Sequence, residues 1–229
     1  LRRIPVIEKV DFDKYSDGYS ELMRKQHAKF GDIDYYSMQK ARITKIISPE
    51  DSVNILEFGC GVGRNLPFIK NEYPNSNIYG YDISQDSIDI ASNNNPDVKF
   101  FSEISDDRFY KKFDLIFISG VYHHIQPELR REVTSLIYDL LNDKGRIVCF
   151  EHNPYNPLTR HMVNTCEFDE DAVLLKAKEL KKIFKAQGFK FRSSSYILFV
   201  PSRFKQFSFI EKYLTWLPLG GQYFVSFEK

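Results

Sequence analysis

Residues 53–69 read VNILEFGCGVGRNLPFI, in which three glycines occupy alternate positions directly after an apolar run. Glycine costs stability in ordered structure unless the backbone must take a left-handed conformation or another group must approach it closely. The run VNILEF (53–58) predicts a buried strand, and NLPFIKNEY (65–73) predicts a helix. A glycine-rich turn between a parallel strand and its helix leaves bare backbone and free N–H groups. The stretch therefore predicts a ligand crevice at the carboxyl end of the first strand.

Apolar runs alternate with helix-length segments along the rest of the chain, as is typical of a sheet with crossover helices. Ser84 is a good N-cap for a helix, and Gly188 is a good helix terminator. Further strands are expected at 78–82, 98–102, 113–120, 146–151, 189–200 and 222–228. Helices are expected at 84–94, 127–143, 171–187 and within 203–221, and residues 11–47 are expected to be mainly helical. These patterns predict an α/β fold with a doubly wound, seven-stranded, mostly parallel sheet and a helical N-terminal cap.

The length and composition indicate one globular domain. Residues 1–229 are expected to divide into a helical cap or lid (1–48) and a core (49–229), with a long irregular stretch at 152–170. A net charge of +1 argues against a broad grip on nucleic acid. The three cysteines are odd in number and far apart, which indicates a reducing compartment, and no spacing with the histidines suggests a metal site. No apolar stretch of about 18 residues and no signal peptide are evident, so a cytoplasmic location without a transmembrane segment is expected.

Two ligand classes use a glycine-rich turn of this kind: dinucleotides and S-adenosylmethionine. The dinucleotide fingerprint places its third glycine three residues after the second, where this chain has Arg64. Asp82 ends the second expected strand, where a carboxylate can accept hydrogen bonds from both ribose hydroxyls. Asp82 supports a ribose-containing ligand without choosing between the two classes.

With Glu57 two positions before the first glycine, ILEFGCGVG resembles the first motif of class I S-adenosylmethionine-dependent methyltransferases of the small-molecule type. The resemblance has motif quality over about residues 50–152. It implies a Rossmann-like methyltransferase fold and S-adenosyl-L-methionine as the cofactor. Glu57 would organise the turn or meet the amino group of this cofactor, and a salt bridge with Arg64 is the alternative. The cofactor-binding residues implied by the resemblance are Glu57, Gly59, Cys60, Gly61, Asn65, Asp82, Ile83, Glu103, Ile104, Ser119, Gly120 and Val121.

Methyl transfer from a sulfonium needs mainly alignment of the acceptor and exclusion of water, because the donor carries its own leaving group. A base is needed only where the acceptor must lose a proton, and imidazole titrates near working pH. Three histidines near the ends of the fourth and fifth strands are the candidate catalytic residues: His123, His124 and His152. One member of the pair His123 and His124 is expected to be structural.

Residues 152–170 are expected to form part of the acceptor pocket, and the stretch from Glu151 resembles a bacterial subgroup of these methyltransferases with unclear substrates. Arg160 is a candidate anion contact, with a surface role as the alternative for Arg160 and His161. The segment FSFIEKYLTWLPLGG (207–221) suggests a lipid-like acceptor, a dimer contact or simply a packed helix. The tyrosines of the expected lid are Tyr15, Tyr19, Tyr35 and Tyr36.

The leading hypothesis is a methyltransferase that acts on a small-molecule acceptor, with a sugar or a glycolipid precursor as candidates, as a monomer or a homodimer. An NAD(P)-dependent oxidoreductase is the second hypothesis, and a non-catalytic S-adenosylmethionine-binding protein is the third. A nucleic-acid methyltransferase is disfavoured, because the chain lacks a basic stripe and the Asn/Asp-Pro-Pro-Tyr/Phe signature after the fourth strand.

Overall fold

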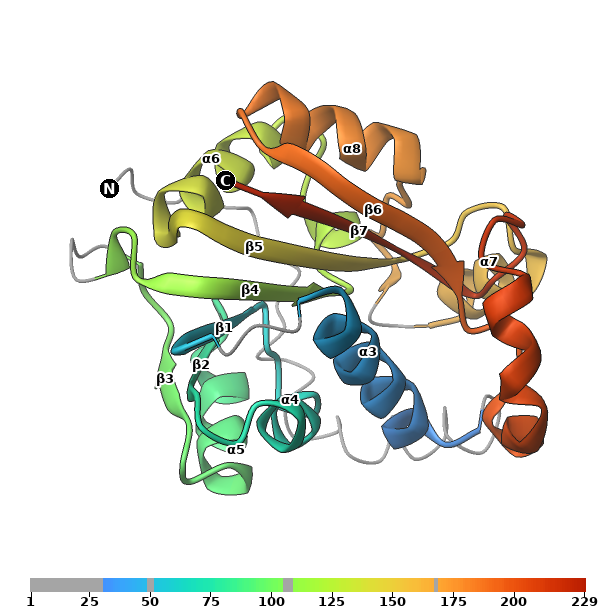
Figure 1. The fold of residues 1–229 in the computed structure, drawn as a ribbon, viewed down its shortest axis with the longest axis horizontal. Helices are drawn as coiled ribbons and strands as arrows, with labels where there is room; N and C mark the ends of the chain where they lie inside the picture. The colour runs from blue at the N-terminus through green and yellow to red at the C-terminus, as the bar shows by residue number, and fades with distance from the viewer. Residues whose placement is uncertain (1–30, 49–51, 105–108, 167–168) are drawn as a thin grey trace.

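A seven-stranded sheet forms the centre of the molecule, with strand order β3-β2-β1-β4-β5-β7-β6 (Figure 1). The computed structural model describes residues 31–48, 52–104, 109–166 and 169–229. Strands β1 to β5 run parallel, and β7 pairs antiparallel with both β5 and β6. The strands are β1 (Asn54–Phe58), β2 (Asn77–Tyr81), β3 (Lys99–Phe101), β4 (Phe113–Ser119), β5 (Leu141–His152), β6 (Lys190–Ile197) and β7 (Gln222–Glu228).

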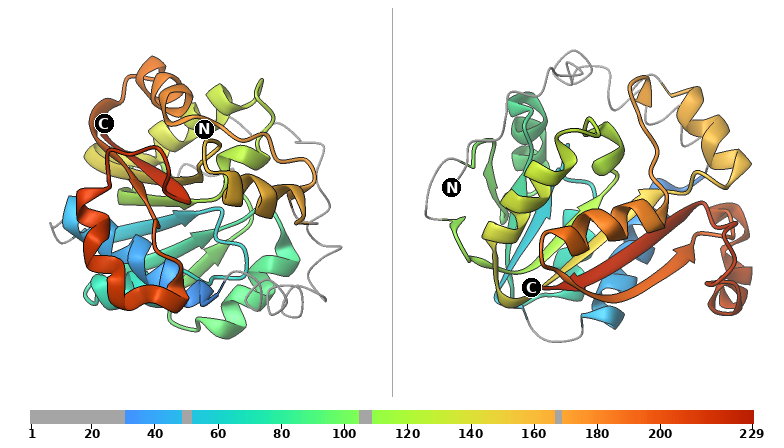
Figure 2. Two further views of the ribbon diagram at one scale, coloured as in Figure 1. Left: turned by 90° about the vertical axis from the view of Figure 1, so that its right-hand side faces the viewer. Right: turned by 90° about the horizontal axis from the view of Figure 1, so that it is seen from above.

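Helices cover both faces of this sheet (Figures 1 and 2). Helices α3 (Ile33–Ile47), α4 (Leu66–Glu72) and α5 (Gln85–Asn94) lie below the sheet in the view of Figure 1. Helices α6 (Arg130–Leu140) and α8 (Ala177–Ala186) lie above it. A 3₁₀ turn, η2 (Tyr122–His124), follows β4, while α7 (Pro157–Asn164) and a long 3₁₀ segment, η4 (Ser202–Tyr213), lie at the right-hand end.

Successive side chains along a strand point to opposite faces of the sheet, and each face packs into its own hydrophobic cluster. In β1, Ile55 packs with Leu66 of α4, while Leu56 faces the cluster that holds Leu136 and Phe184 of α6 and α8. All five side chains are 5% exposed or less. Burial on both faces explains why the parallel strands are almost wholly apolar.

The predicted α/β fold with a doubly wound, mostly parallel sheet is confirmed, and β7 begins and ends at the predicted residues. The boundary between the helix expected at 127–143 and the strand expected at 146–151 was wrong. Helix α6 ends at Leu140, and β5 begins at Leu141. Leu141 is fully buried and pairs with Phe113 of β4, so pairing with the neighbouring strand overrides the helical period.

Two expectations for residues 152–187 also need correction. The stretch 152–170 was expected to be irregular, yet it contains α7, whose N-cap Asn156 accepts hydrogen bonds from the N–H groups of Leu158 and Thr159. The helix expected from residue 171 begins only at Ala177. The six residues before it are not helical, and one of them, Val173, donates its N–H to the carbonyl of His123.

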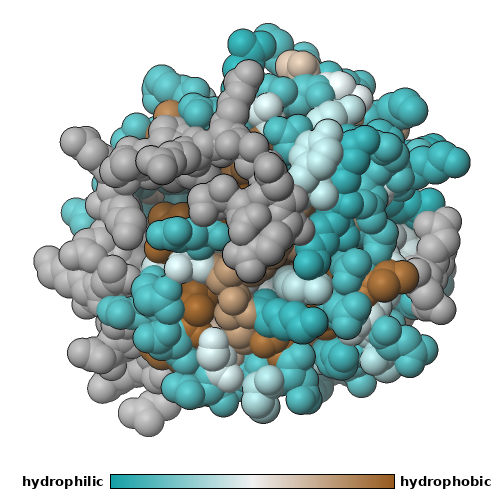
Figure 3. All heavy atoms as spheres, turned by 90° about the vertical axis from the view of Figure 1, so that its left-hand side faces the viewer, coloured by the Kyte–Doolittle hydropathy of each residue, from teal (hydrophilic) through white to brown (hydrophobic). Residues whose placement is uncertain are grey.

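The left-hand end of the molecule is largely hydrophilic where described residues form its surface, apart from a small apolar area at its centre (Figure 3). Among the described residues, no helix is long and apolar enough to cross a membrane. Of the expected N-terminal cap, residues 33–47 form α3 as predicted, whereas Tyr15 and Tyr19 lie outside the described residues. The division into a cap and a core within one domain stays a prediction.

Candidate active site

The glycine turn after β1 uses the left-handed backbone region at three alternate positions. The φ angles are 76° at Gly59, 50° at Gly61 and 78° at Gly63. The N–H groups of Gly59 and Cys60 both donate to the carbonyl of Tyr81, at 2.8 and 2.9 Å, which fixes the turn to the end of β2. Residues with a Cβ rarely adopt these φ values, so the backbone conformation itself accounts for three glycines.

The space around these glycines differs, and the difference shows where a ligand could approach. A Cβ added at Gly59 would lie 2.5 Å from the side chain of Val121, and one at Gly63 would lie 2.7 Å from Asn95 Nδ2. These two glycines allow close packing within the protein. A Cβ added at Gly61 would meet no atom within 4 Å. The middle of the turn therefore presents bare backbone to open space.

Asp82 lies beside this open backbone. Its Oδ2 accepts a hydrogen bond of 2.7 Å from Gly61 N–H, and its Oδ1 accepts one of 3.0 Å from Ser84 N–H. The two backbone donors hold both oxygens of the carboxylate in place. The carboxylate is thus oriented by the turn and by the start of α5.

Glu57 is completely buried at the base of the turn. Its Oε1 accepts a hydrogen bond of 2.6 Å from Asn65 Nδ2, and its Oε2 has no hydrogen-bond partner among the described residues. Burial raises the pKa of Glu57 to about 8, which Asn65 and the nearby Lys40 counteract only in part. Burial also lowers the pKa of Lys40 to about 8, and its Nζ donates to Ser119 Oγ at 2.6 Å. The alternative expectation, a salt bridge between Glu57 and Arg64, is not found in the described part of the chain. Arg64 forms an ion pair with Asp34 instead, with 3.5 Å between Arg64 Nη1 and Asp34 Oδ1.

The other predicted cofactor residues lie at the carboxyl ends of β1, β2, β3 and β4. Ser119 ends β4, Gly120 and Val121 follow it, and the side chain of Val121 packs beside Gly59. The remaining positions differ in burial: Ile83 half-buried, Ile104 buried, Glu103 exposed and Cys60 buried. Burial raises the pKa of the Cys60 thiol, which keeps it neutral. The predicted role of Glu103 in holding an adenine amino group stays a prediction.

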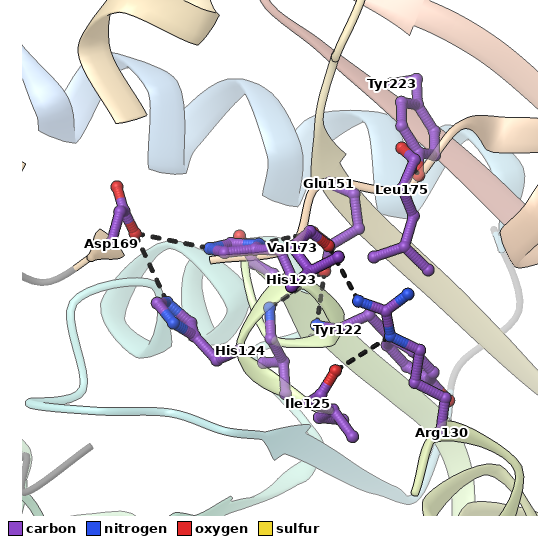
Figure 4. Close-up of polar contacts among 12 residues, drawn as sticks. Tyr122, His123, His124, Ile125, Arg130, Glu151, Asp169, Val173, Leu175 and Tyr223 are labelled. Atoms are coloured by element: carbon purple, nitrogen blue, oxygen red, sulfur yellow. Dashed lines mark hydrogen bonds and ion pairs between the residues drawn. The ribbon is translucent and has the colours of Figure 1, made fainter. Parts of the chain in front are cut away.

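A buried carboxylate, Glu151, ties the end of β5 to the 3₁₀ turn after β4 (Figure 4). Its Oε1 accepts hydrogen bonds from the N–H groups of Val121 and Tyr122, at 3.0 and 2.8 Å. Its Oε2 lies 2.7 Å from His123 Nδ1. One side chain thus fixes the backbone of the turn and the ring of its first histidine.

The structure brings the three predicted catalytic histidines together around His123. The ring centres of His124 and His152 lie 4.1 and 5.0 Å from that of His123. Asp169 approaches from the other side, with its Oδ1 3.6 Å from His123 Nε2 and 3.5 Å from His124 Nε2 (Figure 4). The cluster therefore contains three imidazoles and two carboxylates within a few ångströms.

The three imidazoles of this cluster differ in protonation. Burial lowers the pKa of His123, but Glu151 and Asp169 outweigh it and raise the value to about 9, so His123 is a cation at neutral pH. Burial and the charge on His123 lower the pKa values of His124 and His152 to about 4, so both are neutral. The pKa values of Glu151 and Asp169 are lowered, because the His123 cation outweighs their burial. His123 is therefore a cation between two carboxylates, whereas the rings of His124 and His152 are neutral at neutral pH.

The ligand-type atoms of His123, His124 and Asp169 lie within 4.8 Å of one another, a spacing that a metal ion could bridge. Metal binding requires neutral imidazoles. The cation at His123, paired with two carboxylates, favours an ion-pair cluster instead. The expectation that no metal binds stays a prediction.

The sequence-based prediction missed Lys40 and Asp169, and it left Glu151 out of the catalytic set. Glu151 had a usable signal, because it stands beside His152 at the end of an expected strand. Asp169 belongs to the acidic run at 169–171, which reads like a solvated surface. Lys40 lies on an expected helix with nothing in its neighbourhood to distinguish it from a surface lysine.

Helix α7 occupies the predicted acceptor-side stretch. Arg160 and His161 are both exposed on α7 and, with Pro157 and Asn164, line a shallow depression. Thr159 is buried and donates its hydroxyl to the carbonyl of Gly221 at 2.9 Å. The roles of Arg160 and of α7 in acceptor binding stay predictions.

An open α/β sheet with a glycine turn and a carboxylate at the ends of its first two strands is a nucleoside-binding arrangement. Residues 19–194 match a family of methyltransferase domains, and the chain belongs to that family. The predicted membership of the S-adenosylmethionine-dependent methyltransferases, with S-adenosylmethionine as the cofactor, is confirmed at the level of the family and the fold.

Curated relatives match the central part of the chain. An uncharacterized protein of Rickettsia prowazekii is 34% identical over 104 residues, which are 42% of each protein. Malonyl-[acyl-carrier protein] O-methyltransferase 2 of Ilyobacter polytropus is 42% identical over 83 residues, which are 34% of this chain and 31% of that protein. The chain thus spans less than half the length of these relatives.

Solved structures match over almost the whole chain. A TehB-like S-adenosylmethionine-dependent methyltransferase from Corynebacterium glutamicum has a TM-score of 0.63 at 18% identity, covering 95% of this chain and 99% of that one. Phosphoethanolamine N-methyltransferase 2 of Haemonchus contortus, in complex with S-adenosyl-L-methionine, has a TM-score of 0.61 at 17% identity, covering 97% and 60%. The [4+2]-cyclase SpnF has a TM-score of 0.59 at 15% identity, covering 82% and 81%. At these identities the likeness shows the fold alone.

Proposed function

We propose that the protein transfers a methyl group from S-adenosylmethionine to a small-molecule acceptor. The observation that carries the proposal is the open backbone at Gly61, flanked by the oriented carboxylate of Asp82 and the buried Glu57. When bound, S-adenosylmethionine supplies an electrophilic methyl group on a sulfonium. The protein then has to bind the donor, align the acceptor and exclude water.

The residues around the turn match the chemistry of this donor. Asp82 accepts hydrogen bonds from the ribose hydroxyls, and such bonds to an ionised carboxylate are charge-assisted. The Oε2 of Glu57, which lacks a hydrogen-bond partner among the described residues, accepts from the donor's ammonium group. Val121 and Gly120 form the opposite wall of the crevice.

The histidine cluster suits an acceptor that must lose a proton. His124 is neutral, and its Nε2 faces the Asp169 carboxylate at 3.5 Å, so the ring proton lies at Nε2 and Nδ1 is the nitrogen that takes up a proton from the acceptor. His152 is the second neutral ring and serves as the alternative base. His123 remains protonated between Glu151 and Asp169 and positions the other groups.

Membership of the methyltransferase family sets the NAD(P)-dependent oxidoreductase aside. A non-catalytic S-adenosylmethionine-binding protein remains the alternative, because a fold does not by itself establish a reaction: a similar fold occurs in a protein named as a [4+2]-cyclase. A sugar or a glycolipid precursor is the proposed acceptor class, at the side of the site where α7 lies.

Calorimetry with S-adenosylmethionine and with its demethylated product tests the binding step, and a panel of metabolites with labelled donor tests transfer. Micromolar binding of both compounds, with label transferred to an amphiphilic or saccharide acceptor, is the expected result. NADH binding without affinity for either adenosyl compound would overturn the proposal. Adenosyl binding without transfer to any metabolite class would favour the non-catalytic alternative.

The first prediction concerns Gly61, which borders open space, and Gly63, which is closely packed. Gly61→Ala is expected to weaken donor binding about tenfold, since its methyl group would enter the open space, at a cost in stability of about 1 kcal/mol for a left-handed alanine. Gly63→Ala is the matched comparison. It is expected to cost about 3 kcal/mol, because strain adds to the contact with Asn95. Urea unfolding and calorimetry separate the two effects. Unchanged donor affinity in Gly61→Ala would place the donor elsewhere.

The second prediction concerns protons released on binding. Glu57 is largely protonated at pH 7, because burial raises its pKa to about 8, and a bound ammonium group favours the carboxylate. Donor affinity is therefore expected to rise about tenfold from pH 6 to pH 7.5, with about one proton released at pH 7. Calorimetry in buffers of different ionisation enthalpy measures this proton, and Glu57→Gln should abolish the release. Equal enthalpies in all buffers for the unaltered protein would contradict the role of Glu57.

A further inference from the structure

Large apolar side chains are exposed along residues 202–219, here called the aromatic segment, which comprises η4 and the turns after it. Trp216 is 74% exposed, Tyr213 67% and Phe209 64%. Large exposed apolar areas on a protein surface commonly mark a site of interaction with a protein or a membrane. The large apolar residues exposed in the segment are Phe204, Phe207, Phe209, Ile210, Tyr213, Trp216 and Leu219.

The aromatic segment lies at the end of the molecule where α7 lies (Figures 1 and 2). Asn156, the N-cap of α7, donates its side-chain amide to the carbonyl of Leu219 at 2.6 Å. The opposite end, shown in Figure 3, is largely hydrophilic where described residues form it. Five of the eight aromatic side chains that are exposed among the described residues belong to the aromatic segment.

The backbone of the segment is firmly anchored although its side chains are exposed. The buried Asn153 donates its side-chain amide to the carbonyls of Pro218 and Gly220, at 3.1 and 2.7 Å. Tyr196 N–H donates to the carbonyl of Thr215 at 2.9 Å. The segment therefore presents its rings from a defined scaffold, and their exposure does not come from a loose loop.

The basic side chains of the segment are exposed, whereas its acidic side chain is bound to the protein backbone. Arg203, Lys205 and Lys212 are exposed. The one carboxylate of the segment, Glu211, is turned inward and accepts hydrogen bonds from the N–H groups of Leu198 and Val200, at 3.2 and 3.0 Å. The outer surface thus combines aromatic rings with positive charge.

We propose that the aromatic segment docks the protein on an anionic lipid surface. Tryptophan and tyrosine favour the interface between lipid and water, and basic side chains beside them are attracted to anionic headgroups. A second copy of the chain fits less well. A two-fold contact would bring the same patch against itself, and Arg203, Lys205 and Lys212 would face their own copies. The docking is independent of the proposed methyl transfer, because neither donor nor acceptor takes part in it.

Trp216 is the only tryptophan in the chain, so its fluorescence reports directly on docking. Vesicles of phosphatidylcholine with phosphatidylglycerol are expected to shift its emission to the blue. Pure phosphatidylcholine should shift it much less, and added salt should reverse the shift. Phe209→Ser combined with Tyr213→Ser is expected to weaken vesicle co-sedimentation at least about tenfold. Tyr110→Ser, 52% exposed and outside the segment, is the matched control and should bind normally.

The charge contribution is tested separately. Lys205→Glu combined with Lys212→Glu is expected to weaken co-sedimentation with the anionic vesicles about tenfold, whereas Lys178→Glu on α8 should leave it unchanged. Absence of binding to anionic vesicles, or equal binding by the Phe209/Tyr213 double variant, would overturn the proposal. A dimer in light scattering that dissociates in that double variant would overturn it in favour of a second copy.

Discussion

Asp82→Ala is expected to weaken the binding of S-adenosylmethionine about 100-fold. Two hydrogen bonds from ribose hydroxyls to a charged acceptor together contribute about 3 kcal/mol, and 1.36 kcal/mol corresponds to a factor of ten. The same carboxylate orients Gly61 N–H and Ser84 N–H, so its loss also loosens the turn that the donor contacts. Calorimetry with S-adenosylmethionine and with its demethylated product measures the effect.

Asp86→Ala is the matched control for Asp82→Ala. Asp86 is an exposed carboxylate in the first turn of α5, four residues further along the chain. Its loss removes one negative charge near the same loop and is expected to change donor affinity by no more than about twofold. Binding by Asp82→Ala at the affinity of the unaltered protein would show that the ribose lies elsewhere. Thermal unfolding of both variants establishes that they fold.

His124→Ala is expected to lower turnover at least about 100-fold while donor affinity stays within about twofold. A positioned general base contributes that much to a reaction in which the acceptor loses a proton. His124 is neutral at working pH, since burial and the His123 cation lower its pKa to about 4, and Asp169 lies 3.5 Å from its Nε2. Methyl transfer with labelled donor gives the turnover, and calorimetry gives the affinity.

Lys178→Ala on the exposed face of α8 is the control for His124→Ala and is expected to leave turnover unchanged. Proton NMR titration checks the charges without any acceptor. His123 is expected to titrate near pH 9 and His124 near pH 4, with assignment from single substitutions. Normal turnover in His124→Ala would rule out the base role at this residue and leave His152 as the candidate.

Most of the fold, and the part of the candidate site formed by the glycine turn and Asp82, could be predicted from local sequence patterns. The strand before the glycine turn, the turn itself and Asp82 lie within thirty residues. The strand is indicated by an apolar run, the turn by its glycines, and Asp82 by its position directly after a predicted strand. The N-cap Ser84 was predicted from its residue type, and its Oγ accepts from Ser87 N–H. Such features can be predicted because each depends on near neighbours in the chain.

The features that were missed depend on contacts between distant segments. Lys40 meets Ser119 from 79 positions away, and Asp169 meets His123 across 46 positions, as the numbering shows. The start of β5 at Leu141 depends on pairing with Phe113 in another strand. Helix α7 is different, because its start could have been predicted. Asn156 is a common N-cap residue and Pro157 is favoured at the first helical position, yet the stretch was predicted to be irregular.

Glu151 holds Val121 N–H, Tyr122 N–H and the His123 ring with one carboxylate. Residues 119–124 would therefore be a poor place to vary this protein for a different substrate, because a change there would disturb both the proposed donor-binding residues and the proposed base. Helix α7 is held through its first residues and one buried threonine, and it offers exposed positions such as Arg160 and His161. A mutant library confined to that helix would vary the proposed acceptor side and leave the glycine turn and the histidine cluster unchanged.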